Sequence, residues 1–250
     1  MKIVTDTGTT FAREMVPELR NPFGLLINMI LPLLFLLLFG PLLSDIPGLG
    51  GSPWQWFLPG ILVMLALSGT TGAGAGLLNE MASGSFERML VTPLSRVAIL
   101  IGRTMKEMVT LLAQAVLLIV VLLPSEFRLY PAGALVGLLI LAVFGIGLGS
   151  LSFALAIAAK KNQTVFYGVQ QLAFFPLLLS SGVLLPMEQA PSWVYAISRA
   201  NPASYIVEAE RTLFTGGFTD MSVLYGSLAA AGTAVAGLML GGRLMRRATL

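Results

Sequence analysis

Few residues in this chain could carry out chemistry. The 250-residue sequence contains no Cys and no His, which excludes a structural zinc site, a disulfide framework, a thiolate nucleophile and a Ser-His-Asp triad. The lysines are Lys2, Lys106, Lys160 and Lys161, and none of them follows a Gly, so the phosphate-binding motif G-x-x-x-x-G-K-[ST] is absent. We therefore predict that the chain is not an enzyme, and that any uphill work draws its energy from another subunit.

The composition is that of an integral membrane protein. Hydrophobic residues make up 56% of the chain, charged residues only 11%, and the mean hydropathy is +0.86. An average soluble domain has about 25% charged residues, and one with so few charges could not cover its surface with polar groups.

Six charge-free intervals are long enough for membrane-spanning helices, since about 20 apolar residues cross the hydrocarbon core of a bilayer. None of them alternates with the period of two that a membrane β-barrel strand requires. The spans predicted from these intervals cover approximately residues 22–44, 54–79, 106–124, 131–159, 163–187 and 221–242, and the third begins at Lys106 and Glu107, just before its charge-free interval of 108–125. The predicted fold is an all-α integral membrane protein whose residues 1–250 form a single transmembrane domain.

The basic residues predict which side of the membrane each loop faces. When successive loops are assigned to alternate sides, all but three of the 15 Lys and Arg residues fall on one side. The exceptions are Arg128, Arg199 and Arg211. The positive-inside rule then places both termini in the cytoplasm. Because the basic residues are divided among short segments, we expect no nucleic-acid partner.

Residues 11–20 have an amphipathic pattern. On a helical wheel Phe11, Met15 and Leu19 share one arc, and the charged residues of the segment lie opposite them. We expect this helix to lie in the inner interface of the membrane, with its apolar face toward lipid. A solvated N-terminal tail is the alternative.

The cytoplasmic connection over residues 80–107 predicts a short helix held away from the bilayer by two longer ones. Ser85 is placed to cap a helix over residues 86–90, which Pro93 ends because the residue before a proline avoids the α conformation. Thr92 and Pro93 then suit the N-cap and first position of the next helix. Such a shape favours docking on a partner.

The outer segment, residues 188–220, predicts one or two short helices between the fifth and sixth spans. Asn201 and Pro202 form an N-cap and first-turn pair. Behind them Tyr205, Glu208 and Arg211 fall on one helical face, with Glu208 and Arg211 placed to interact at i and i+3.

Two further patterns lie within the spans. The charge-free intervals hold no ionisable residue at membrane depth, which argues against a self-powered secondary transporter. Gly72 with Gly76 and Gly145 with Gly149 have the G-x-x-x-G spacing that permits close approach of two helices. This spacing suits internal packing and dimerisation equally.

The layout resembles the permease subunits of type 2 ABC exporters, and most closely the drug-resistance branch typified by the daunorubicin exporter permease. In the cytoplasmic connection the similar residues are Glu80, Gly84, Glu87, Arg88, Leu90, Thr92, Pro93 and Arg96. In the outer region they are Ser181, Gly182, Pro186, Pro191, Trp193, Asn201, Pro202, Tyr205, Arg211 and Gly216.

The resemblance implies a set of partners. A coupling helix would dock on a separate ATP-binding subunit, of which two copies would bind ATP and Mg²⁺. Those subunits would rock two permease chains, a homodimer or a pair with a paralogue, between inward- and outward-open states within the lipid bilayer. No cofactor is expected in this chain itself.

It also implies site residues. The coupling helix would contain Phe86, Glu87, Arg88, Met89, Leu90, Thr92 and Pro93. The outer gate would contain Pro186, Trp193, Asn201, Pro202, Tyr205, Glu208 and Arg211. By the same analogy the second and fifth spans would line the path, with Met64, Ser68, Phe166, Gln170 and Phe174 on its surface.

The prediction is therefore a multi-pass permease of a bacterial inner membrane that exports a hydrophobic or amphiphilic substrate such as a drug. A lipid, polysaccharide or ion exporter is the alternative within the family. A non-transport scaffold or a channel is the alternative from another class, although a channel would normally carry a ring-forming filter or a charged vestibule.

Overall fold

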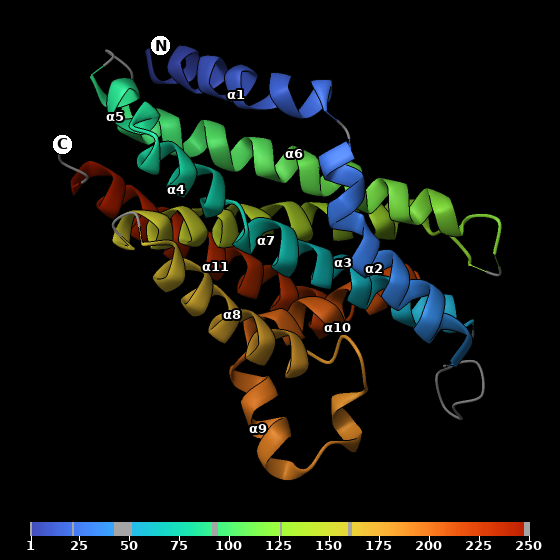
Figure 1. The fold of residues 1–250 in the computed structure, drawn as a ribbon. Helices are drawn as coiled ribbons and strands as arrows, with labels where there is room; N and C mark the ends of the chain where they lie inside the picture. The colour runs from blue at the N-terminus through green and yellow to red at the C-terminus, as the bar shows by residue number, and fades with distance from the viewer. Residues whose placement is uncertain are drawn as a thin grey trace.

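The chain folds into a bundle of helices (Figure 1). The computed structural model describes residues 2–21, 23–42, 52–91, 95–125, 127–159 and 162–247, and within these ranges every regular element is helical, as predicted. The helices are α1 (Lys2–Arg20), α2 (Phe23–Leu42), α3 (Pro53–Thr71), α4 (Gly74–Ala82), α5 (Ser85–Leu90), α6 (Arg96–Leu122), α7 (Pro131–Ala158), α8 (Gln163–Leu179), the 3₁₀ turn η1 (Met187–Gln189), α9 (Ser192–Ala200), α10 (Pro202–Phe214) and α11 (Met221–Arg247).

Five helical segments are long and apolar enough to cross a membrane, so the chain is a multi-pass membrane protein. They are Phe23–Leu42, Pro53–Ala82, Arg96–Leu122, Pro131–Ala158 and Met221–Arg246. Each corresponds to one of the six predicted spans. Both chain ends and α5 lie at one end of the bundle, whereas α9 lies beyond the opposite end of α8 (Figure 1).

Two helices differ in extent from the spans predicted for them. The predicted fifth span, 163–187, corresponds to α8, which ends at Leu179 after 17 residues, because Gly182 at φ +79° turns the chain there. At about 1.5 Å per residue α8 is roughly 26 Å long. Helix α6 contains the predicted third span, 106–124, and begins earlier, at Arg96, with Ser95 as its N-cap. The N-cap predicted at Thr92 and Pro93 lies outside the described residues.

Helix α7 packs against α11, α6, α3, α4 and α10. A Cβ atom on Gly147 would lie 2.7 Å from the backbone of Thr233 and Ala234 in α11, and one on Gly237 would strike the backbone of Gly147. Gly145 lies against Leu111 of α6. The glycines of α7 therefore serve close internal packing.

The second predicted span is interrupted between α3 and α4. The amide of Gly74 donates to Oγ of Ser152 in α7 at 2.8 Å, and the same hydroxyl donates to the carbonyl of Thr71. One side chain of α7 thus satisfies backbone groups that the break would otherwise leave unpaired.

Helix α10 buries a carboxyl group against α7. Glu210 is fully buried, and neither carboxyl oxygen has a hydrogen-bond partner among the described residues. The group lies over Gly137, where any Cβ atom would strike it. Burial raises the pKa of Glu210 from 4.5 to about 8.

We predict that Glu210 makes the chain less stable as the pH rises. The folded chain keeps this proton up to about pH 8, whereas the unfolded chain releases it near 4.5. The stability linked to Glu210 is therefore greatest below pH 4.5 and is lost as the pH rises toward 8, by at most about 1.4 kcal/mol per pH unit. In detergent, Glu210→Leu should flatten the fall of the melting temperature over this range and raise the melting temperature at pH 8.

The matched control is Glu208→Gln, since Glu208 is partly exposed and pairs with Arg199. This variant should keep the pH dependence of the wild type. An unchanged slope in Glu210→Leu would contradict the prediction.

Candidate functional site

Helix α5 is a short element with one anchored face. Gly84 precedes it at φ +72° and turns the chain sharply after α4. Ser85 was predicted to be the N-cap, but it is the first helical residue, and its hydroxyl donates back to the carbonyl of Glu80 at 3.3 Å. The position before it is filled by Gly84, which has no side chain to cap the helix.

The anchored face of α5 consists of Phe86 and Met89. Both are buried in an apolar cluster that includes Leu77 of α4 and Ile99 of α6. Arg88 is exposed. The side chains of Glu87 and Leu90, and all of Thr92 and Pro93, lie outside the described part of the chain. Among the described coupling-helix residues, the structure therefore separates buried anchors from an outward-facing cation.

Helix α1 docks on α6 through its polar face. Asp6, Thr10, Glu14 and Glu18 recur every four residues and form one stripe. Oδ2 of Asp6 accepts from the amide of Ser95 at 3.0 Å. Thr10 packs on Gly102, where a Cβ atom would come within 2.7 Å. The predicted amphipathic helix is present and begins earlier, at Lys2; Leu19 on its apolar arc is exposed.

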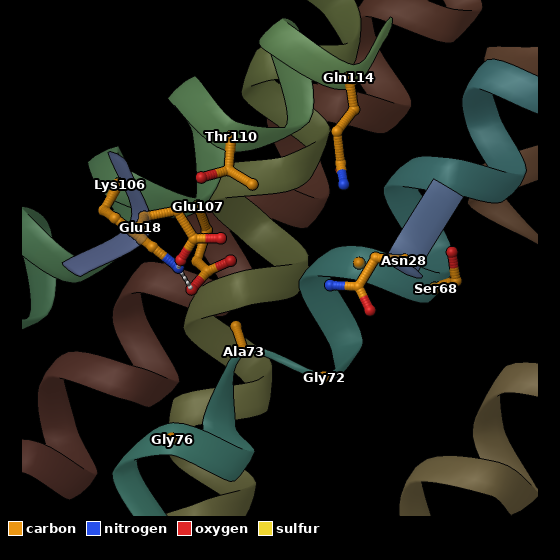
Figure 2. Close-up of a pocket in the computed structure, with 11 residues that line it drawn as sticks. Glu18, Asn28, Ser68, Gly72, Ala73, Gly76, Lys106, Glu107, Thr110 and Gln114 are labelled. Carbon is orange, nitrogen blue, oxygen red and sulfur yellow. Dashed lines mark hydrogen bonds and ion pairs between the residues drawn. The ribbon is translucent and has the colours of Figure 1, made fainter. Parts of the chain in front are cut away.

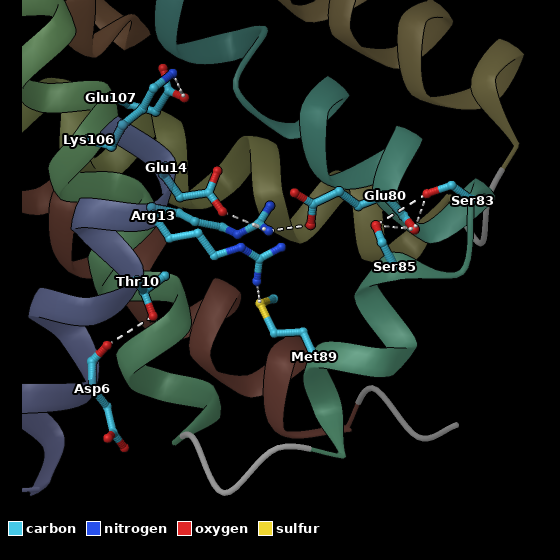
Figure 3. A network of polar contacts seen from close by, with 11 residues as sticks. Asp6, Thr10, Arg13, Glu14, Glu80, Ser83, Ser85, Met89, Lys106 and Glu107 are labelled. Carbon is cyan, nitrogen blue, oxygen red and sulfur yellow. Dashed lines mark hydrogen bonds and ion pairs between the residues drawn. The ribbon is translucent and has the colours of Figure 1, made fainter. Parts of the chain in front are cut away.

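Ion pairs tie α1 and α4 to α6. The guanidinium of Arg103 is 3% exposed, lies 3.1 Å from Oε1 of Glu14 and donates a hydrogen bond to Glu80. Figure 3 shows Glu14 and Glu80 approaching each other from their two helices. One turn along α6, Nζ of Lys106 lies 2.9 Å from Glu18 and 3.1 Å from Glu107. Because α5 follows α4 directly, these pairs also fix the position of α5.

A cleft of about 350 Å³ lies beside these ion pairs (Figure 2). Its lining residues come from α1, α2, the α3–α4 break and α6. They are Glu18, Asn28, Ser68, Gly69, Gly72, Ala73, Gly76, Lys106, Glu107, Thr110 and Gln114. Asn28 and Gly76 are exposed, so the cleft opens to the surface of this chain.

One wall of the cleft has almost no side chains. A Cβ atom on Gly69 or Gly76 would meet nothing within 4 Å, whereas one on Gly72 would lie 3.5 Å from the carbonyl oxygen of Gly69. Of the predicted pair Gly72 and Gly76, only Gly76 therefore borders open space. On the opposite wall the hydroxyl of Thr110 has no hydrogen-bond partner among the described residues, and Nε2 of Gln114 donates to the carbonyl of Leu25 at 3.0 Å.

The predicted path residues are dispersed. Ser68 lines this cleft, whereas Met64 and Phe166 are fully buried. Gln170 lines a separate pocket of about 130 Å³, and Phe174 is half-buried beside Phe175. Their role as a path surface stays a prediction.

The predicted outer-gate residues connect α10 to its neighbours. As predicted, the Asn201 side chain caps α10, accepting from the amide of Ala203 at 2.9 Å. Its Nδ2 also donates to the carbonyl of Leu177 at 2.7 Å. Arg211 lies 3.6 Å from the ring centre of Trp56 and donates to the carbonyl of Gly182 at 2.8 Å.

Glu208, which was predicted to interact with Arg211, pairs with a basic residue of α9. Glu208 lies 3.5 Å from Arg199 of α9, and the hydroxyl of Tyr205 donates to the Arg199 carbonyl at 2.8 Å. Of the other predicted outer-gate residues, Trp193 on α9 is exposed, and Pro186 immediately precedes η1.

The ionic residues of α1 and α6 were not predicted as a site. The charged residues within 11–20 were placed opposite the apolar arc, and no partner was predicted for them. The signal was present in the four-residue spacing from Asp6 to Glu18, together with Arg103 and Lys106 at i and i+3.

We predict that Arg103 and Glu14 are energetically coupled. Arg103→Gln should lower the melting temperature in detergent sharply, because it leaves Glu14 and Glu80 facing each other without a cation, at a cost of about 3–5 kcal/mol. Glu14→Gln in that background should recover part of the loss. The control is Arg246→Ala at an exposed position of α11. Strictly additive effects of the two substitutions would contradict the coupling.

Comparison with known proteins identifies the family. The ABC-2 type transporter family matches residues 5–215. The daunorubicin resistance ABC transporter permease protein DrrB1 of Streptomyces coeruleorubidus is 28% identical over 226 residues, which is 88% of this chain and 80% of that protein. The putative transport permease ycf38 of Cyanophora paradoxa is 32% identical over 202 residues, 78% of this chain and 69% of that protein. The probable multidrug ABC transporter permease YbhR of Escherichia coli K12 is 21% identical over 164 residues, which is 64% of this chain and 44% of that protein.

With its helical bundle, five apolar spans and a short helix anchored at one end, this chain belongs to the ABC-2 type transporter family.

Proposed function

We propose that the chain is the permease subunit of an ATP-driven exporter of hydrophobic or amphiphilic drugs. The observation that carries the proposal is the family match over residues 5–215, together with relatives named for daunorubicin and doxorubicin resistance. The sequence offers no phosphate-binding loop of its own, so ATP and Mg²⁺ are bound by a partner subunit. Two copies of that subunit act on two permease chains, either identical or paralogous.

Helix α5 is the proposed contact with the ATP-binding subunit. Its inner face is fixed by Phe86 and Met89, and α1 braces it as well, since Arg13 donates to the sulfur of Met89 at 2.8 Å. A displacement of α5 would therefore be transmitted to α4, α6 and α1 together. Alternating access requires such a rigid connection between the docking surface and the spans.

The proposed topology has six spans, with α8 as the fifth and both termini in the cytoplasm of a bacterial cell. Helix α8 exposes an apolar surface that includes Leu172 and Phe175. Such a surface suits lipid or a second permease chain. Both chain ends lie at the same end of the bundle as α5, which agrees with this topology (Figure 1).

A lipid, polysaccharide or ion exporter remains the alternative within the family, and a scaffold or channel the alternative from another class. In a drug exporter, a lipophilic drug should stimulate ATP hydrolysis by the reconstituted complex. A scaffold or channel would show no coupled hydrolysis.

We predict that reversing the charges on α5 weakens assembly. In Glu87→Lys with Arg88→Glu, the permease should copurify less with its ATP-binding subunit, and coupled ATP hydrolysis should fall at least about tenfold, because charge complementarity at the docking surface is reversed. Reversal of the exposed Arg246 to Glu is the control for a general charge effect. Intact assembly and hydrolysis in the double variant would show that α5 is not the contact.

We predict opposite accessibility for two introduced cysteines, and the chain has no Cys of its own to interfere. Ser192 on α9 and Ser83 beside α5 are both exposed. In intact cells a membrane-impermeant maleimide should label Ser192→Cys, whereas Ser83→Cys should react only after permeabilisation. The reverse pattern would overturn the orientation.

A further inference from the structure

We propose that the cleft between α1, α2, the α3–α4 break and α6 binds the ammonium or other cationic group of an amphiphile. As a substrate site the proposal rests on the export function proposed above. As a binding site it rests on the charge, shape and depth of the cleft.

The cleft is lined by more acidic than basic side chains. It is lined by the carboxylates of Glu18 and Glu107 and by the single ammonium of Lys106, which is already engaged by both carboxylates. The adjoining pocket of about 90 Å³ adds Glu14, Glu80 and Arg103 to the same group. The linings of the two pockets together contain four carboxylates and two basic side chains, and an uncompensated charge at low dielectric is costly. A cation in the cleft would reduce this imbalance, whereas an anion would increase it.

The cleft also has room for a ligand. About 350 Å³ is within the range of cavities that hold drug-sized molecules. Glycine forms much of one wall, and a Cβ atom on Gly69 or Gly76 would point into unoccupied space. Thr110 and Gln114 of α6 line the other side.

The position of the cleft suits an amphiphile that enters from the membrane. Glu18 lies near the end of α1, and Asn28 lies in the second turn of α2, so the polar lining spans the beginning of a membrane-crossing helix. Next to Asn28, the side chains of Ile27 and Ile30 are half-exposed and apolar. The charged group would meet the ionic end, and the apolar body would lie along α2.

The test uses the complete exporter purified in detergent and two probes of matched shape and opposite charge, tetraphenylphosphonium and tetraphenylborate. Tritiated tetraphenylphosphonium should bind the wild type at least about tenfold more tightly than tetraphenylborate, a difference of about 1.4 kcal/mol. Equal binding of the two ions would overturn the charge argument. Glu107→Gln should raise the Kd for the cation about 5–10-fold and leave that for the anion nearly unchanged.

Filling the cleft supplies a second, independent test. Gly76→Leu places a side chain in open space at the wall, so it should abolish binding of the cation without lowering the melting temperature. Gly232→Leu is the matched control, since Gly232 on α11 also has open space around it and does not line the cleft. Undiminished binding in Gly76→Leu would overturn the site.

A lipid ammonium and an exported cation share this chemistry. If added phosphatidylethanolamine competes with tetraphenylphosphonium in the wild type but phosphatidylglycerol does not, a lipid occupies the site, and the ammonium proposal stands. If neither lipid competes, the site selects a soluble or drug-like cation.

The failure of the site and the failure of the export function give different results. A complex that assembles and hydrolyses ATP but binds the cation equally well in Gly76→Leu and Gly232→Leu would remove the site and leave the export function. If the chain recruits no ATP-binding subunit but loses cation binding in Gly76→Leu, the export function is removed and the cation site stands.

Discussion

The burial of one guanidinium group constrains the end of the molecule at which both chain ends lie (Figure 1). Arg103 lies inside the protein with 3% of its side chain exposed, and a cation there is stable only while carboxylates remain beside it. Glu14 and Glu80 supply them from α1 and α4. Helix α1 is therefore required to lie along α6, and α4 must end next to it. The geometry of α5 follows, since it is joined to α4 through Gly84.

The same ion pairs explain why a helix with so polar a face belongs to a membrane protein. A stripe that contains Asp6, Glu14 and Glu18 would bind weakly to an apolar surface, but here it meets Arg103 and Lys106. The apolar arc that includes Leu19 is then left facing outward. Charged side chains are thus collected in the N-terminal half of α6, where they hold the peripheral helices.

Local sequence patterns predicted the features that depend on local physics. Hydropathy located the apolar spans, Asn201 was recognised as a cap from its neighbour Pro202, and Ser85 with Pro93 indicated the short helix α5. Features that depend on distant partners were not predictable. The premature end of α8 depends on the turn at Gly182, whose carbonyl Arg211 holds from α10. The cleft exists because Ser152 of α7 stabilises a break in the second span, and no pattern near Gly72 identifies that hydroxyl.

The cleft and α5, the proposed contact with the ATP-binding subunit, are mechanically connected because α4 lines the cleft and leads directly into α5. This helix has nine residues and carries Gly76 at the cleft wall and Glu80 in the ion pair with Arg103. A cation beside Glu107 would act on the same charge cluster that holds α4 in place, and an ATP-binding subunit on α5 would act on the far end of α4. Two ligands that bias one rigid element must influence each other's affinity by the same factor. If both sites are occupied as proposed, substrate binding in the cleft and ATP-driven movement of α5 would be coupled through α4.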